Sequence, residues 1–224
     1  GILISGRGSN MAALVEAAHD PAYPAEIVCV ISNRPDAPGL KFAQGRNIST
    51  HVIDHKSYAT RESFDAALND YLQSQKLDLI ACAGFMRIMT PVLLEPWAGK
   101  MINIHPSLLP LYKGTHTHER ALADGVKVHG CSAHYVTEEL DGGPVIARSE
   151  VPVLPGDTPE TLSARVLAEE HKLYPKALAM AAAYRSAIQD IKTEDQREMI
   201  NSLTYWLDGF VPWAQVAASL GRPV

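Results

Sequence analysis

The sequence predicts an α/β fold with an open, doubly wound, mostly parallel sheet, followed by an antiparallel edge and a long helix near the C-terminus. Three observations predict it. Apolar strand-like runs alternate with helix-like runs over residues 1–106. These apolar runs are continuous, which is typical of parallel strands that helices cover on both faces. Repeated strand–helix units of this length form a right-handed, doubly wound sheet.

The parallel part of the sheet occupies the first half of the chain. Strands are expected at residues 1–5, 26–32, 49–54, 77–84 and 100–106. These runs are continuous and rich in Ile, Val, Leu and Ala, without alternation of apolar and polar residues. Helices are expected between them, at residues 10–20, 39–47, 61–75 and 90–98.

The pattern changes after a further helix expected at residues 117–125. Strand-like runs at 130–137 and 144–153 flank the sequence EELDGG, whose Asp-Gly-Gly turn predicts a hairpin or antiparallel edge. A long helix-like run follows at 155–188. Asp157 and Glu160 resemble a capping box at its start, and Pro175 is expected to kink or break it.

Composition limits the class of protein. The chain has 224 residues, with 46% hydrophobic and 20% charged residues, as expected of one globular domain with a short appendage. The net charge of -5, without a Lys/Arg run, argues against a nucleic-acid groove. No apolar run reaches membrane-spanning length and no signal peptide is visible. The cysteines, Cys29, Cys82 and Cys131, lie in apolar runs, so we expect buried free thiols and a cytoplasmic location.

A glycine-rich turn follows the first strand. Gly6 and Gly8 permit a tight turn, and Ser9 and Asn10 are expected to cap the next helix, whose first N–H groups attract an anion. Residue 11 is Met where a dinucleotide fingerprint has its third glycine, and the Walker lysine is absent. The loop therefore suits a single phosphate monoester, and an ordinary strand-to-helix turn is the alternative.

A second polar group lies where the fifth parallel strand ends. Asn103 and His105 are two residues apart on a strand, so their side chains point the same way. Ligands of open α/β sheets bind at the carboxyl ends of the strands, where the phosphate loop and residues 84–89 also lie. Asp141 follows in the later turn. A core histidine with an amide partner and an ordinary turn aspartate are the structural alternatives.

The motifs NIHPSLLPLYKG (103–114) and GCSAHYVTEELDGGPVI (130–146) resemble those of the folate-dependent formyltransferases, whose catalytic set is the Asn, His and Asp within them. The segments SGRGSN, AGFMRI and EEHKLYP resemble the branch of this family that acts on glycinamide ribonucleotide. The resemblance covers residues 1–188. It implies a Rossmann-like formyltransferase fold and transfer of the formyl group of 10-formyltetrahydrofolate to the ribonucleotide amine in purine synthesis, without a metal.

The resemblance also implies roles for individual residues. The catalytic residues would be Asn103, His105 and Asp141. The residues that bind the substrate phosphate and ribose would be Gly8, Ser9, Asn10 and Glu170. The folate-binding residues would be Arg61, Met86, Arg87, Ile88, Met89, Thr137, Glu138, Glu139, Leu140 and Asp141. We expect a catalytic domain at 1–188, with a phosphate-binding half (1–99) and a folate and catalytic half (100–188), and a tail (189–224) that packs on it.

The chemistry of formyl transfer fits these three residue types. Attack by an amine places negative charge on oxygen and positive charge on nitrogen. Asn103 can donate a hydrogen bond to the oxygen, His105 can donate to it or move a proton, and Asp141 can accept the amine proton. Ser132 and His134 share a strand face and are expected to support the site.

Other functions remain as alternatives. Formyltetrahydrofolate hydrolase shares the catalytic residue types but has less need of a phosphate loop, and a non-catalytic folate- or nucleotide-binding module could share the fold. Methionyl-tRNA and sugar-nucleotide formyltransferases fit less well. His116 and His118 could resemble a metal pair, but no third ligand is evident, so no metal is expected. The expected partners are the two small substrates, with no nucleic acid and no membrane, in a monomer or homodimer.

Overall fold

The computed structural model describes residues 1–189, which form two compact units, one from Gly1 to Ile104 and one that begins at His105. Each unit is described separately. The tail expected from residue 189 onward lies outside the described residues, except for Gln189.

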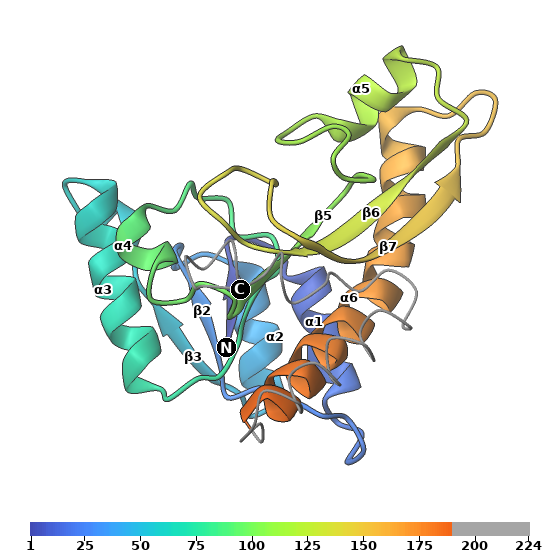
Figure 1. Ribbon diagram of the computed structural model, residues 1–224. Helices are drawn as coiled ribbons and strands as arrows, with labels where there is room; N and C mark the ends of the chain where they lie inside the picture. Colours follow the sequence, from blue (N-terminus) through green and yellow to red (C-terminus); the bar gives the residue numbers. More distant parts are fainter. Residues whose placement is uncertain (190–224) are drawn as a thin grey trace. The chain divides into compact units, whose positions relative to one another are not determined.

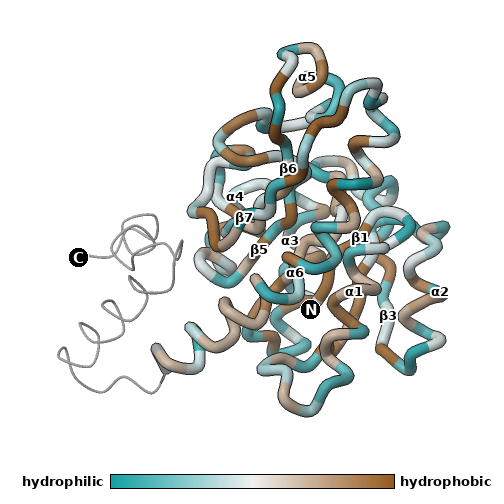
Figure 2. Tube along the Cα trace, turned by 90° about the vertical axis from the view of Figure 1, so that its right-hand side faces the viewer, coloured by the Kyte–Doolittle hydropathy of each residue, from teal (hydrophilic) through white to brown (hydrophobic). Residues whose placement is uncertain are grey.

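The first unit contains the predicted parallel strands. They are β1 (Ile2–Ile4), β2 (Cys29–Ser32), β3 (Ser49–Val52), β4 (Ile80–Cys82) and β5 (Met101–His105), whose last residue begins the second unit. Their order is β3-β2-β1-β4-β5, and every neighbouring pair is parallel. The residues of β1, Ile2, Leu3 and Ile4, are fully buried. The hydropathy-coloured trace is brown along β1, as expected of a strand covered on both faces (Figure 2).

Helices cover both faces of these strands. They are α1 (Ser9–Ala17), α2 (Pro38–Gly45), α3 (Arg61–Ser74) and α4 (Pro91–Leu94), with a short 3-10 helix, η1 (His55–Ser57). Helices α1 and α2 pack together, and α3 packs with α4 on the opposite side of the strands (Figure 1). The predicted α/β, doubly wound fold is therefore confirmed.

The second unit contains the predicted hairpin and long helix. Strands β6 (Val128–Tyr135) and β7 (Val145–Pro152) are antiparallel, with a register irregularity at Ala133/His134. Helix α5 (Thr117–Ala123) precedes them, and α6 (Pro159–Gln189) runs along both strands (Figure 1). Tyr174 and Val166 of α6 are fully buried, so this helix supplies much of the unit's core.

Two local predictions were wrong, and a third was wrong in part. Helix α4 covers four residues instead of the predicted 90–98. Thr158 and Thr161, instead of Asp157 and Glu160, form the reciprocal cap of α6, because each backbone N–H donates to the other hydroxyl, at 2.9 and 3.3 Å. The Asp157 carboxylate instead pairs with Arg165. Pro175 was expected to kink or break the long helix, and it does not break α6, which continues past it to Gln189.

Two features bear on the class of protein. Cys29, Cys82 and Cys131 are buried free thiols, as predicted. Among the described residues, no helix combines the length and the apolar character needed to cross a membrane.

Candidate active site

The first unit has a topological switch point between β1 and β4. The chain steps from β1 to β2 to β3 in one direction and then returns to place β4 on the other side of β1. Ligands of such sheets bind at the carboxyl ends of the strands beside this point. The segments that leave β1 and β4 there are the phosphate loop and residues 84–89, both predicted from the sequence to bind substrate.

The phosphate loop begins its helix differently from the prediction. Gly8 is the N-cap of α1, with φ 72° and ψ 33°, and in the described part of the chain no side chain caps this end. Ser9 and Asn10 were predicted to cap the helix, but they are its first two residues. The left-handed backbone at Gly8 starts the helix one residue early and leaves the first-turn N–H groups for an anion.

Helix α2 supports this loop from behind. The Gly39 N–H donates to the Gly6 carbonyl at 3.1 Å. A Cβ at Gly39 would lie 2.7 Å from Ile4 Cδ1 and 3.2 Å from the carbonyl oxygens of Gly6 and Arg7. Only glycine permits this close approach, and the sequence pattern gave no signal for it.

The segment that leaves β4 is anchored by its backbone. The Ser5 N–H donates to the Gly84 carbonyl at 3.1 Å, and the Met86 N–H donates to Ser5 Oγ at 2.8 Å. The Met86 and Ile88 side chains are 71% and 60% exposed. The segment therefore presents apolar side chains from a fixed backbone, which is suitable for one face of a flat ring system.

Strand β5 carries Asn103 and His105 on one face, because residues two apart on a strand point the same way. His105 is buried and its Nε2 lies 2.9 Å from the Tyr112 carbonyl oxygen. A carbonyl only accepts hydrogen bonds, so Nε2 carries the ring proton of the neutral imidazole. Nδ1 is then the nitrogen left for a reaction.

Asp141 lies beside this nitrogen within the second unit. Its Oδ2 is 3.4 Å from His105 Nδ1 and accepts the Gly114 N–H at 2.8 Å. Its Oδ1 is 3.6 Å from His134 Nε2. The His105, Asp141 and His134 side chains are only 7%, 8% and 3% exposed, which strengthens their electrostatic coupling.

The turn that carries Asp141 needs its glycines. Asp141 has φ 49°, and the Gly142 N–H donates to the Glu139 carbonyl at 3.1 Å. A Cβ at Gly142 or Gly143 would overlap the Glu139 side chain or the Tyr135 carbonyl. The sequence EELDGG thus forms a tight turn that directs a carboxylate inward, beyond the ordinary role of a turn aspartate.

Burial and neighbouring charges shift the pKa values of His105 and Asp141. Burial lowers the pKa of His105 and outweighs the Tyr112 carbonyl and the Asp141 carboxylate, which both raise it. Burial raises the pKa of Asp141, but contacts from His134 and the Gly114 N–H, with the imidazole charges, outweigh burial and lower this pKa. The pair therefore combines an ionised carboxylate with an imidazole whose Nδ1 can take up a proton.

The other predicted binding residues lie in both units. Glu170 is only 6% exposed, so it is not an ordinary solvated helix glutamate. Arg61 is exposed in the first turn of α3. Arg87 and Met89 are half-buried. Thr137 is half-buried, and Glu138, Glu139 and Leu140 form the exposed outer part of the Asp141 turn.

Ser132 and His134 were predicted to share a strand face and to support the site, and in the structure they contact different residues. His134 contacts Asp141, whereas Ser132 Oγ accepts the Leu109 N–H and donates to the Ser107 carbonyl, which holds the loop after β5. The Tyr112 carbonyl and the Gly114 N–H were missed, because backbone groups leave no mark in the sequence. Within the described residues, no group of three or more His, Cys, Asp or Glu could hold a metal ion.

Known proteins are similar to this chain in sequence and in fold. Residues 2–178 match the model of the formyl transferase family. The chain is 40% identical over 208 residues to phosphoribosylglycinamide formyltransferase of Escherichia coli, covering 93% of this chain and 92% of that protein. It is 47% identical over 182 residues to the trifunctional purine biosynthetic protein adenosine-3 of Bos taurus, but it spans only 18% of that protein's length.

A solved structure gives the same result. The crystal structure of phosphoribosylglycinamide formyltransferase from Brucella melitensis has 50% sequence identity and a TM-score of 0.78, covering 81% of this chain and 94% of that one. The chain belongs to the phosphoribosylglycinamide formyltransferases of the formyl transferase family.

Proposed function

We propose that this chain transfers the formyl group of 10-formyltetrahydrofolate to the amine of glycinamide ribonucleotide, in purine biosynthesis, by direct attack of the amine on the formyl carbon. The observation that carries the proposal is the buried His105–Asp141 pair, with Nδ1 and Oδ2 3.4 Å apart, on a chain that belongs to this family.

Each proposed catalytic residue handles charge or a proton that the reaction moves. Asn103 donates an amide N–H to the formyl oxygen as negative charge develops there, a contribution of roughly 3–4 kcal/mol for a fixed donor. His105 takes up or relays the amine proton through Nδ1, because its Nε2 is engaged by Tyr112. Asp141 stabilises the imidazolium that forms or accepts the proton through water.

The step balances without a further reactant. The amine nitrogen forms a bond to the formyl carbon, and the bond from that carbon to the folate nitrogen breaks. The amine loses one proton and the departing folate nitrogen gains one. His105 and Asp141 hold the proton between these events, and no oxidant or covalent enzyme intermediate is required.

The remaining residues bind the two substrates. The backbone at Gly8, Ser9 and Asn10 holds the ribonucleotide phosphate at the start of α1. Glu170 accepts hydrogen bonds from the ribose hydroxyls. The folate is bound by Arg61, Met86, Arg87, Ile88, Met89, Thr137, Glu138, Glu139, Leu140 and Asp141, with the apolar Met86 and Ile88 against the pterin.

One assay tests this function. The protein is mixed with a 10-formyl folate analogue, and loss of the formyl group is followed with and without glycinamide ribonucleotide. Loss only with the ribonucleotide is expected. Loss without it would instead identify a hydrolase, and no loss under either condition would identify a binding module.

A further inference from the structure

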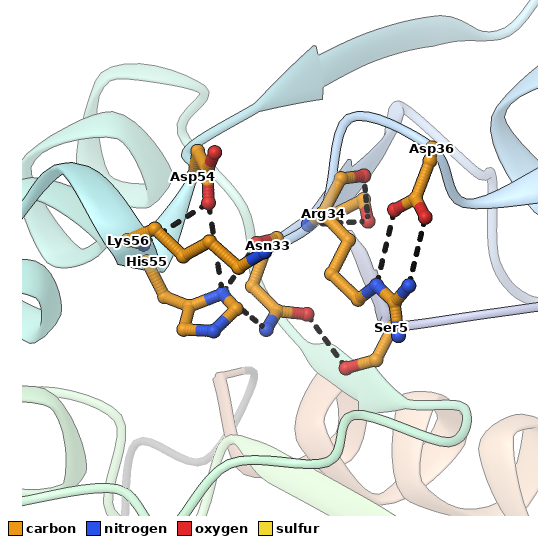
Figure 3. A network of polar contacts seen from close by, with 8 residues as sticks. Ser5, Asn33, Arg34, Asp36, Asp54, His55 and Lys56 are labelled. Carbon is orange, nitrogen blue, oxygen red and sulfur yellow. Dashed lines mark hydrogen bonds and ion pairs between the residues drawn. The ribbon is translucent and has the colours of Figure 1, made fainter.

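A chain of polar side chains outside the proposed reacting group joins the carboxyl ends of β1, β2 and β3. Ser5 Oγ donates to Asn33 Oδ1 at 2.6 Å, and Asn33 Nδ2 lies 3.1 Å from His55 Nδ1 (Figure 3). His55 Nδ1 also lies 2.8 Å from the Asn33 carbonyl oxygen. Because a carbonyl only accepts, Nδ1 carries the ring proton and donates it there, so His55 holds the backbone of Asn33 and not its side-chain amide. Ser5 and Asn33 are buried, so the hydrogen bond between them is protected from competing water.

This row of hydrogen-bonded side chains reaches the segment that follows β4 through Ser5. Ser5 contacts it twice, because the Ser5 N–H donates to the Gly84 carbonyl and Ser5 Oγ accepts the Met86 N–H. Since Oγ accepts from Met86, its own hydrogen is directed to Asn33. The amide of Asn33 therefore sets the direction of the hydroxyl that holds Met86.

The later part of the same segment is anchored separately. The guanidinium of Arg87 lies 5.6 Å from the centre of the Phe64 ring, and the His55 ring meets Phe64 edge-on at 6.4 Å. The Thr90 N–H donates to the buried Asp65 carboxylate at 2.6 Å. The backbone between these anchors is fixed, while Met86 and Ile88 remain exposed. Buried polar contacts that hold an exposed apolar surface are typical of a preorganised binding segment.

We propose that three residues, Ser5, Asn33 and His55, are positioning residues for the binding of formyl folate. They fix the backbone of residues 84–86 and do not touch the reacting atoms. This inference rests on the proposed role of residues 86–89 in folate binding. It extends the folate site to three residues at the ends of β1, β2 and β3 that hold the segment from behind.

The test compares KM for the formyl folate with KM for glycinamide ribonucleotide. Asn33→Ala leaves the Ser5 hydroxyl without its acceptor and is expected to raise KM for the folate about tenfold. The KM for the ribonucleotide and kcat should stay within about twofold. His55→Leu is expected to raise the folate KM about threefold, and His55→Asn, which keeps a polar group near the Nδ1 position, should restore it.

Ser32→Ala is the matched control. Ser32 is equally buried at the end of β2, but among the described residues its hydroxyl hydrogen-bonds only to the Arg34 backbone. It should leave both KM values unchanged. A folate KM within about twofold of wild type in both Asn33→Ala and His55→Leu would overturn the proposal, as would equal rises in both KM values. If Asn33→Ala does not fold, the folate KM values of His55→Leu and His55→Asn test the proposal.

Equilibrium titration with a 10-formyl folate analogue separates this proposal from the proposed function. Wild-type protein without ribonucleotide-dependent transfer would refute the function. The same variants would still show, through weaker or unchanged binding of the analogue, whether Ser5, Asn33 and His55 position the folate segment.

Discussion

Asp141 shows how a single residue acquires chemistry from its backbone and neighbours. Its left-handed φ of 49° and the following glycines direct the carboxylate inward, where the Gly114 N–H and two histidines meet it. The motif resemblance predicts Asn103, His105 and Asp141 as the catalytic residues. The sequence could not show which ring nitrogen of His105 carries the proton. The partner of Nε2 is the backbone carbonyl of Tyr112, and every residue has a backbone carbonyl, so the pattern of residue types carries no trace of this contact.

His134 is expected to tune Asp141. Its contact helps to lower the pKa of Asp141 against the opposing effect of burial. In His134→Leu this pKa should rise, so the carboxylate becomes protonated at a higher pH. The acid limb of the kcat/KM profile should therefore move to higher pH, as a coupled titration of the His105–Asp141 pair.

The matched control for His134→Leu is Ser132→Ala on the same strand, since Ser132 contacts Ser107 and Leu109 and not Asp141. A pH profile for His134→Leu that superimposes on the wild-type profile would contradict this role.

His129 should make stability depend on pH. Burial, with the charge of His118, lowers the pKa of His129 to about 4, against the Pro106 carbonyl, which raises it. The unfolded chain binds this proton near pH 6.5, whereas the folded chain binds it only near pH 4. Stability should therefore fall as pH falls between these values, by at most about 3 kcal/mol.

Urea unfolding of wild type and His129→Leu at pH 7 and pH 4 checks this expectation. The stability of the wild type relative to the variant should be lower at pH 4 than at pH 7. A difference between the two proteins that is the same at both pH values would show that His129 does not titrate in this way.

At the scale of elements, strand positions were predictable and element ends were not. The apolar runs for β1 to β5 are continuous, so burial on both faces specifies them. The residue at which a helix begins depends on the backbone conformation and hydrogen bonds of the single residue that caps it. The cap of α6 lies at Thr158, one residue after the predicted Asp157, and α1 begins after a left-handed Gly8.

Gly8→Ala tests the start of α1. An alanine at φ 72° is strained, and its Cβ would lie 2.8 Å from Met11 Cε and 3.3 Å from Gly39 Cα. We expect a loss of about 1–2 kcal/mol in unfolding free energy and weaker binding of glycinamide ribonucleotide. Thermal unfolding and titration with the ribonucleotide measure both effects.

The control for this variant is Gly45→Ala. Gly45 is the last residue of α2, and the described residues leave open space within 4 Å of its Cβ position. This change should leave ribonucleotide binding intact and stabilise the helix by up to about 1 kcal/mol. Equal loss of binding in both variants would contradict the role of the Gly8 backbone.

At the scale of the whole molecule, the pattern of alternating strands and helices predicted the fold class, and ordered motifs predicted the family. The predicted halves divide at residues 99 and 100, whereas the compact units divide within β5, between Ile104 and His105. A sequence pattern marks where an element begins, but the contacts that separate two compact units form only in three dimensions.

The central claim is that His105 and Asp141 together move the proton of the attacking amine. The measurement that tests it most directly is ribonucleotide-dependent turnover of Asp141→Asn and His105→Asn, with folding checked by circular dichroism. Each variant should lose at least about 10²-fold in kcat. Folded variants that turn over within about twofold of wild type would contradict the mechanism.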